Sequence, residues 1–233
     1  MQKRIAKCVL TLALSLAAPV LLAQTLAPDA LLRAVSEDVI GEITQDQAFR
    51  PIDPAKVAAV VESRIVPLFD FPHMTRLAMA RNWRLATPEQ QRVLIDEFTT
   101  LLVRTYSVAL ARYRDEIVEF KRLRSGPLAT EVTVRSEVKQ PGAENMTLDY
   151  DMAKTQAGWK IYDVTVAGVR VVTTFREVFA EKVRVGGVDG LIKFLAEENR
   201  EGGAKFNTVK RSFWEKSRLV FAIFQNLFRS GGQ

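Results

Sequence analysis

Apolar residues recur at helical spacing through the first half of the chain and predict three main helices there. The first covers residues 28–47. The second covers 53–66 and begins at an aspartate followed by a proline, a good N-cap and first helical residue. The third begins at Thr87-Pro88-Glu89-Gln90, which supplies a capping box, and it carries a broad apolar stripe. A shorter helix that ends near Ala80 is expected between the second and the third.

The spacing changes from helical to alternating after residue 116, which predicts strands. Turn signals at Pro141-Gly142 and Ala157-Gly158 leave only short connections, so the sheet should be an antiparallel meander. Helical spacing returns over 173–185, stops at Gly186-Gly187, and resumes over 189–200. Helices, then strands, then helices predict an α+β fold: N-terminal helices, a four-stranded antiparallel sheet and C-terminal helices. The four strands are expected over residues 117–124, 129–139, 146–155 and 158–168.

The fourth predicted strand is unusual because it is apolar on both faces. By alternation, Trp159 and Ile161 share one face, while Tyr162, Val164 and Val166 share the other. A half-exposed antiparallel strand normally keeps one polar face. Something apolar should therefore lie against each side of this strand. Protein core and a bound apolar ligand both explain the pattern, and the residues leave open which face would serve a ligand.

The first residues have the pattern of a secretory signal peptide. Lys3, Arg4 and Lys7 precede an apolar run over 8–18, and small Ala23 offers a cleavage site. The predicted organisation is a signal peptide over 1–23, an α+β domain over 24–200 and a basic extension over 201–233. Cleavage would remove three basic residues and no acid, so the formal charge falls from +6 to +3, which gives no case for nucleic acid.

The chain carries little catalytic equipment. His73 is the only histidine, and the only cysteine precedes the predicted cleavage site, so a zinc site or a histidine-dependent triad is not expected. Asp70 is interpreted as a cap of the following helix rather than as the partner of His73 in acid–base chemistry. Asp149 and Asp151 fit a solvated sheet face. This pattern favours a binding protein over an enzyme, with no cofactor.

Five blocks of the sequence, in the right order over roughly residues 30–200, resemble the MlaC family, whose members are also called toluene-tolerance or organic-solvent-resistance auxiliary proteins. The blocks are FDFPHMTRLAMARNWRLATPEQ (69–90), LLVRTY (101–106), WKIYDVTVAGV (159–169), FREVF (175–179) and GVDGLIKFL (187–195). Arg170 departs from the family pattern, which has a small residue there, and would add charge near the rim of a cavity.

The resemblance implies a periplasmic phospholipid carrier of Gram-negative bacteria with a deep apolar cavity between sheet and helices. It also implies two partners, an inner-membrane ABC transporter complex and an outer-membrane lipoprotein complex, with which such carriers maintain the lipid asymmetry of the outer membrane. On this basis we expect twelve residues to line the lipid site: Met74, Trp83, Phe98, Leu101, Leu102, Tyr106, Tyr162, Val164, Val166, Val171, Val172 and Phe175.

The segment over 205–229 reads as a basic amphipathic helix outside the family pattern. Two hypotheses remain for it: contact with an anionic membrane surface, or docking on the domain or on a partner. Two other functions also remain beside the carrier. One is an adaptor without a ligand, and the other is a periplasmic enzyme of lipid or cell-wall metabolism that uses His73.

Overall fold

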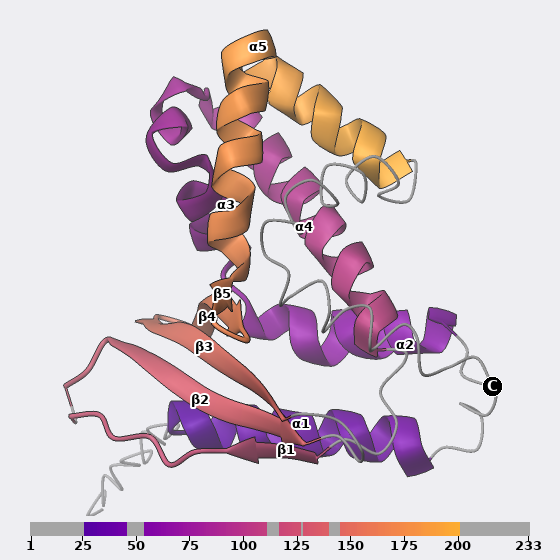
Figure 1. The fold of residues 1–233 in the computed structure, drawn as a ribbon, viewed down its shortest axis with the longest axis vertical. Helices are drawn as coiled ribbons and strands as arrows, with labels where there is room; N and C mark the ends of the chain where they lie inside the picture. The colour runs from indigo at the N-terminus through magenta and orange to yellow at the C-terminus, as the bar shows by residue number, and fades with distance from the viewer. Residues whose placement is uncertain (1–25, 46–53, 111–116, 127, 140–144, 201–233) are drawn as a thin grey trace, which may run out of the picture.

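The computed structural model describes residues 26–45, 54–110, 117–126, 128–139 and 145–200, and over 43–45, 54–56 and 106–110 it describes the backbone only. The predicted signal peptide over 1–23 and the amphipathic segment over 205–229 lie outside these residues. The elements follow the order helices, strands, helix, so the predicted α+β class is confirmed (Figure 1).

The N-terminal half is helical as predicted. Its elements are α1 (Pro28–Gln45), α2 (Pro54–Val60), the π-helical turn η2 (Val61–Ile65), the 3-10 turns η3 (Val66–Leu68) and η4 (Ala80–Leu85), α3 (Phe71–Met79) and α4 (Pro88–Leu110). The predicted helix over 53–66 is thus divided, because its last turn is π-helical and the chain then tightens into η3. Pro67 lies in η3, and a proline has no backbone N–H with which to continue an α-helix.

Two predicted helix starts are confirmed by their hydrogen bonds. Asp70 Oδ1 accepts from the backbone N–H of His73 at 2.9 Å and caps α3. At the start of α4, the Thr87 hydroxyl accepts from the N–H of Gln90 at 3.2 Å, and the Gln90 side chain accepts from the N–H of Thr87 at 2.9 Å. This is the reciprocal capping box that the sequence predicts.

The sheet is a five-stranded antiparallel meander in the order β1-β2-β3-β4-β5. The prediction had four strands, with the last running unbroken over 158–168. The chain instead turns at Ala167 and Gly168, both with positive φ, and returns as a fifth strand of two residues. A two-residue loop with positive φ at both positions suits a tight hairpin. The strands are β1 (Ile117–Phe120), β2 (Glu131–Lys139), β3 (Met146–Thr155), β4 (Gly158–Val166) and β5 (Val169–Arg170).

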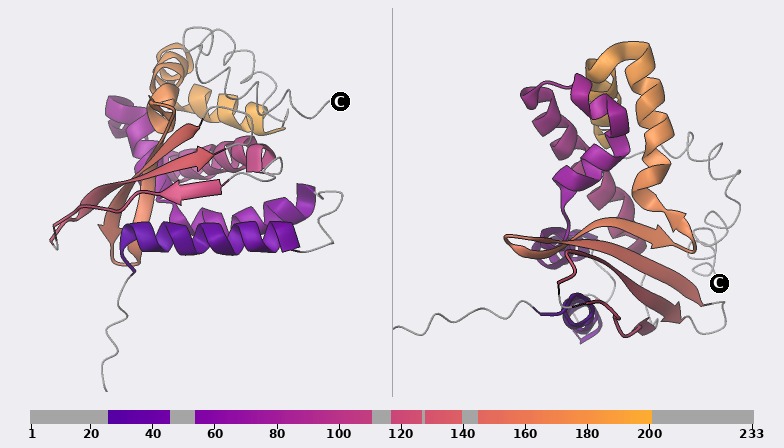
Figure 2. Two further views of the ribbon diagram at one scale, coloured as in Figure 1. Left: turned by 60° about the horizontal axis from the view of Figure 1, so that its bottom comes forward. Right: turned by 90° about the vertical axis from the view of Figure 1, so that its left-hand side faces the viewer.

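The last helix, α5 (Val171–Arg200), is bent at Gly187, where φ is 67°. The sequence predicted a stop at this glycine pair, and the bend confirms it, since a residue with positive φ interrupts a helix. Together α3, α4 and α5 form a helix layer, and its contacts with the sheet run mainly through β4 and β5. Figures 1 and 2 show this layer on one side of the sheet and α1 along the other.

Candidate functional site

One face of the sheet is apolar and packs against α1. The register places Val134 opposite Tyr150, and Met152 opposite Ile161, so these side chains share this face. We call the group around them the sheet cluster. Its buried members are Leu32, Phe120, Val134, Met152 and Ile161, and its partly buried members are Leu31, Leu68, Phe69, Val118, Leu123, Val132, Tyr150, Trp159 and Val164.

A bulge in β4 decides which of its residues share that face. Met152 pairs with Ile161, but the preceding Asp151 pairs with Asp163, so Tyr162 is an extra residue in β4. One extra residue reverses the alternation beyond it. As a result, Trp159, Ile161 and Val164 all pack in the sheet cluster.

The sequence predicted that Trp159 and Ile161 lie on the opposite face of the strand from Val164 and Val166. That prediction is wrong, because it assumed unbroken alternation and the bulge interrupts it. Val166 pairs with Leu148, two positions along β3 from Tyr150, which keeps Val166 on the apolar face.

Tyr162 leaves the apolar face and joins the sheet to α3. Its ring stacks on that of His73, with the ring centroids 4.4 Å apart. Burial is the main cause that raises the pKa of Tyr162, and the carboxylate of Asp151 raises it further. His73 is thus held between a capped helix start and an aromatic ring.

A second apolar group lies within the helix layer, and we call it the helix core. Phe98, Phe175 and Phe179 form its centre, with ring centroids 4.9, 5.0 and 5.9 Å apart in edge-to-face pairs. Six of the twelve expected lipid-lining residues are buried here. They are Met74, Phe98, Leu101, Leu102, Val172 and Phe175. Trp83 and Val171 pack against this core and are partly buried. The side chain of Tyr106 lies outside the described residues.

The expected site residues therefore fall in different places. Most belong to the closely packed helix core, Val164 and Val166 belong to the sheet face, and Tyr162 belongs to neither. Sequence reasoning assigned no ligand role to Leu148 or Tyr150, although the alternation of β3 already places both on its apolar face. Both are half-buried.

The hydroxyl of Tyr150 is buried and lies within hydrogen-bond reach of Ser136. Burial raises the pKa of Tyr150, and a hydrogen bond with Ser136 opposes the shift only in part. The group therefore stays neutral, which agrees with the apolar side chains around it.

The apolar surface continues from the sheet toward α2 along α1. Leu32 of α1 packs in the sheet cluster, whereas Val39, about two turns further on, packs in a third group. That group brings α1, α2, η2 and α4 together through Val35, Val39, Val57, Val60, Val61, Ile65, Val66 and Val103. Helix α1 thus spans two apolar groups and lies along the apolar face of the sheet.

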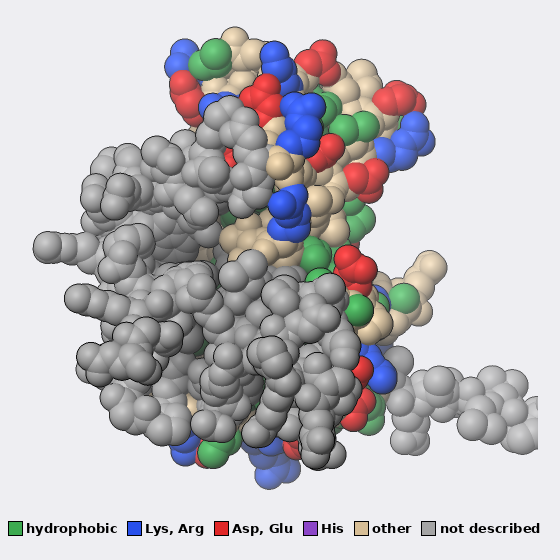
Figure 3. All heavy atoms as spheres, turned by 90° about the vertical axis from the view of Figure 1, so that its right-hand side faces the viewer, with side chains coloured by type: hydrophobic (Ala, Val, Ile, Leu, Met, Phe, Trp, Pro, Cys, Tyr) green, Lys and Arg blue, Asp and Glu red, His purple; other side chains and the backbone are tan. Residues whose placement is uncertain are grey.

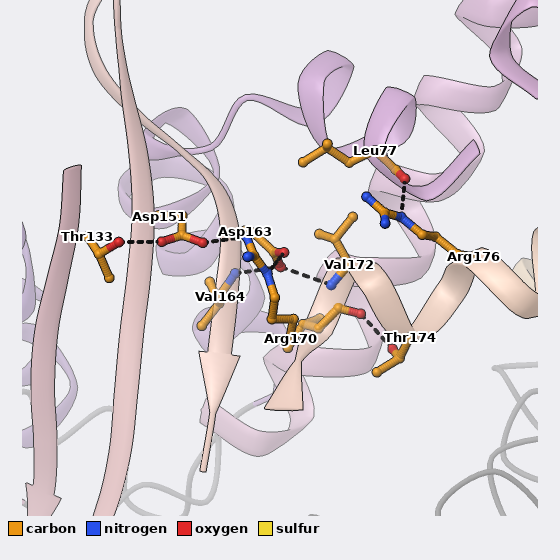
Figure 4. Close-up of polar contacts among 10 residues, drawn as sticks. Leu77, Thr133, Asp151, Asp163, Val164, Arg170, Val172, Thr174 and Arg176 are labelled. Atoms are coloured by element: carbon orange, nitrogen blue, oxygen red, sulfur yellow. Dashed lines mark hydrogen bonds and ion pairs between the residues drawn. The ribbon is translucent and has the colours of Figure 1, made fainter. Parts of the chain in front are cut away.

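The polar face of the sheet carries a network that ties β4 to α5 (Figure 4). Asp163 is buried, with 1% of the residue exposed. One of its oxygens accepts from the backbone N–H groups of Val164 at 2.9 Å and Val172 at 3.0 Å, and the other accepts from Arg170 Nε at 2.9 Å. Arg170 Nη2 lies 2.5 Å from Asp151, which accepts from the Thr133 hydroxyl. Asp163 therefore stabilises the first turn of α5.

Arg170 is held by two carboxylates on this polar face. Its hydrogen bond with Asp163 is the main cause that raises its pKa further above the ordinary value. Arg170 pairs with Thr165 in the β4–β5 register, and Thr165 pairs with Asp149, so all three lie on the polar side. Arg170, whose charge was expected at the rim of a cavity, thus lies on the opposite side of the sheet from the apolar face.

Three consecutive residues of β4 join the sheet to the helix layer. The carbonyl of Ile161 accepts from the N–H of Asp70 at 2.8 Å, where α3 begins. Tyr162 stacks on His73, and Asp163 caps α5. The bulge makes this possible because it turns Tyr162 and Asp163 toward the helices while Ile161 stays in the sheet cluster.

Over the described ranges, no group of three or more His, Cys, Asp or Glu side chains could hold a metal ion. In the same part of the chain, no helix is long and apolar enough to cross a membrane.

Comparisons with known proteins agree with this fold. A toluene tolerance protein of Pseudomonas putida, ttg2D, is 21% identical over 179 residues, which cover 76% of this chain and 83% of the relative. The solved structure of a phospholipid-binding protein from Ralstonia solanacearum, in complex with a phospholipid, shares 39% identity and has a TM-score of 0.68. That match covers 75% of this chain and 97% of the other. The family model described as MlaC protein matches residues 33–197, so the chain belongs to the MlaC family.

Proposed function

We propose that this chain binds a phospholipid and carries it through the periplasm. In this proposal residues 1–23 direct export, residues 24–200 form the binding domain, and the lipid passes between an outer-membrane lipoprotein complex and an inner-membrane ABC transporter complex. This exchange would maintain the lipid asymmetry of the outer membrane. The proposal is supported by membership of the MlaC family and by the phospholipid bound to the similar Ralstonia protein.

The observation that carries the proposal is the half-buried apolar face of the sheet. Val164, Tyr150 and Trp159 of the sheet cluster remain partly exposed there, and so does Val166 on the same face. Exposing acyl chains to water costs about 0.8 kcal/mol per methylene, so two tails of about thirty methylenes would cost about 24 kcal/mol. Burial of the tails alone therefore supplies ample affinity, and the site needs no strong polar group for the headgroup.

The acyl chains are proposed to lie against this face, between the sheet and the helices that carry Val39 and Val103. In this arrangement the expected residues of the helix core, such as Phe98 and Phe175, hold the layer in place rather than contact the lipid. No enzymatic step is proposed, because His73 is engaged by the ring of Tyr162 and the described residues offer no metal cluster.

Lipid extraction tests the function directly. Protein purified under native conditions is extracted with organic solvent, and the extract is examined by mass spectrometry. We expect phospholipid in an amount comparable to that of the protein. An extract without phospholipid would overturn the carrier proposal and leave an adaptor without a ligand as the better explanation.

A pair of tryptophan variants tests the location. Val164→Trp places a large side chain on the half-buried sheet face and should reduce bound lipid while thermal unfolding stays cooperative. Val172→Trp is the matched control, because Val172 is fully buried in the helix core and overpacking there destabilises the fold. If Val164→Trp abolishes folding as Val172→Trp does, the sheet face is ordinary core.

A further inference from the structure

A loop at one end of the sheet presents arginines to solvent. Just after β1, the N–H of Lys121 donates to the carbonyl of Arg135 at 2.8 Å, which continues the pairing with β2 by one residue. Leu123 is half-buried in the sheet cluster. Arg122 and Arg124, on either side of Leu123 in the chain, are both exposed.

The same end also presents apolar side chains to solvent. Leu128, in the loop between β1 and β2, is 92% exposed, and Leu26, just before α1, is 54% exposed. The N–H of Leu123 donates to Asp29 Oδ2 at 3.2 Å, which ties this loop to the first turn of α1. Leu128 is therefore an exposed leucine on an anchored loop. Figure 1 shows this loop at the left, beside the start of α1 and the β3–β4 turn.

Two backbone hydrogen bonds hold the part of the loop that precedes β2. The N–H of Ala129 donates to the carbonyl of Gly126 at 3.1 Å, which closes a turn around Leu128. The N–H of Lys154, near the end of β3, donates to the carbonyl of Thr130 at 2.8 Å. Lys154 thus lies beside the loop, and Trp159, its partner in the β3–β4 register, is half-buried at the same end.

The positive charges here are largely uncompensated. Among the described residues, no carboxylate pairs with Arg122, Arg124 or Lys154. Arg33 of α1 is not counted with them, because its Nη2 donates to the carbonyl of Phe120 at 3.1 Å. In sequence, Glu119 and Glu131 flank this loop, and Asp29 accepts a hydrogen bond from it. Further along the sheet, by contrast, Lys121 pairs with Glu137 and Lys139 pairs with Glu119. Over the helix layer, basic and acidic side chains alternate (Figure 3).

We propose that this basic end, made of Arg122, Arg124, Lys154, Leu26 and Leu128, rests on the surface of an anionic phospholipid bilayer. Basic side chains near such a surface are attracted to its headgroups, and exposed leucines enter the boundary between headgroups and acyl chains. Half-buried Trp159 suits the same boundary, because aromatic rings favour the interface. The inference rests on the proposed carrier function, for which it supplies the place where the carrier meets a membrane.

The test measures binding of the full chain to phosphatidylcholine vesicles with and without phosphatidylglycerol. Wild type should bind the anionic vesicles and lose that binding at high salt, because salt screens exposed charges. The double variant Arg122→Gln/Arg124→Gln should bind them about thirtyfold more weakly, at about 1 kcal/mol for each basic residue near the surface. Leu128→Ser should weaken binding about tenfold through lost apolar burial.

The matched control is Arg81→Gln/Arg84→Gln in η4. Both arginines are exposed, and the change in net charge is the same. This variant should bind anionic vesicles as wild type does. Equal losses in the two double variants would overturn the proposal, because net charge alone would then explain binding. Wild-type affinity in Arg122→Gln/Arg124→Gln would overturn it too.

Extraction of lipid from the same preparations separates this proposal from the carrier function. Bound phospholipid in wild type and in the double variant, with vesicle binding lost only in the double variant, supports both. Bound phospholipid without any binding of wild type to anionic vesicles overturns the docking surface alone. Vesicle binding that is lost in the double variant, from protein that carries no phospholipid, supports the surface and overturns the carrier function.

Discussion

The helix core and the sheet face are both built from apolar side chains, but they differ in how completely those side chains are buried. In the helix core, Phe98, Phe175 and Phe179 contact one another and are almost fully enclosed. On the sheet face, Val164 and Val166 are only half-buried. An apolar group that closes on itself contributes to stability, whereas one that stays partly open is available to a ligand. Substitutions should therefore separate the two regions.

The largest effect is expected in the helix core. Phe98→Ala removes a fully buried ring and its two edge-to-face contacts and should lower the free energy of unfolding by about 3–5 kcal/mol. Denaturant unfolding followed by circular dichroism measures the loss. Val166→Ala on the sheet face is the comparison and should cost under about 1 kcal/mol, because that side chain is only partly buried. Similar losses would contradict the division into core and ligand surface.

The junction between the two regions should show the next largest effect. Asp163→Ala removes a buried carboxylate that caps α5 and holds Arg170, and it should lower the free energy of unfolding by about 2 kcal/mol. The full penalty of a broken buried pair is not expected, since the side chain of Arg170 is 50% exposed and can be hydrated.

The control at the junction is Asp149→Ala on the same face of the sheet. Asp149 lies 4.0 Å from Arg135 in a more exposed pair, so its loss should cost under about 1 kcal/mol. If Asp163→Ala is no more destabilising than Asp149→Ala, the network does not join the sheet to the helix layer in the way described.

A smaller effect is expected at the start of α4. Thr87→Ala removes one half of the capping box and should cost about 1 kcal/mol in thermal or denaturant unfolding. Thr100→Ala on the exposed side of the same helix is the control. It should be neutral or slightly stabilising, since alanine has the higher helix propensity. A loss at Thr100 as large as at Thr87 would show that the cap contributes nothing of its own.

The smallest effect is confined to alkaline pH. Burial raises the pKa of Tyr150 above its ordinary value of 10.0, so the folded protein keeps a proton that the unfolded chain releases. Stability is therefore unaffected below pH 10 and falls as the pH rises from 10 toward the folded-state pKa. Tyr150→Phe cannot ionise, so its stability should fall less steeply above pH 10 than that of wild type. Denaturant unfolding of both proteins at neutral and alkaline pH measures this difference. An equal loss of unfolding free energy in wild type and Tyr150→Phe above pH 10 would contradict the prediction.

Local signals in the sequence were sufficient for most of the elements. The Thr87 capping box, the Asp70 cap and the glycine pair at 186–187 each act within a few residues, so their chemistry is visible in the chain itself. Alternation likewise located the strands. The short strand β5 was missed because Ala167 adopts a positive φ that alanine rarely takes, so the turn has weak sequence signals.

The arrangement of the candidate site needed tertiary information. The bulge at Tyr162 depends on the register between β3 and β4, which no local pattern specifies, and it reversed the faces of every later residue in β4. The separation of Phe98 and Phe175 from Val164 likewise depends on how the helix layer sits on the sheet. Helical spacing shows which side of a helix is apolar but does not show what that side contacts.

The short outer strands affect how one copy of this protein meets another. Strand β5 pairs only with the last two residues of β4, and further back Phe69 bridges to Ile161 on the same outer edge. At the other side of the sheet, β1 is four residues long. Long free edges invite a second chain to add a strand, and brief or covered edges discourage it. The meander therefore offers its neighbours little template for aggregation, even though one of its faces is built from apolar side chains.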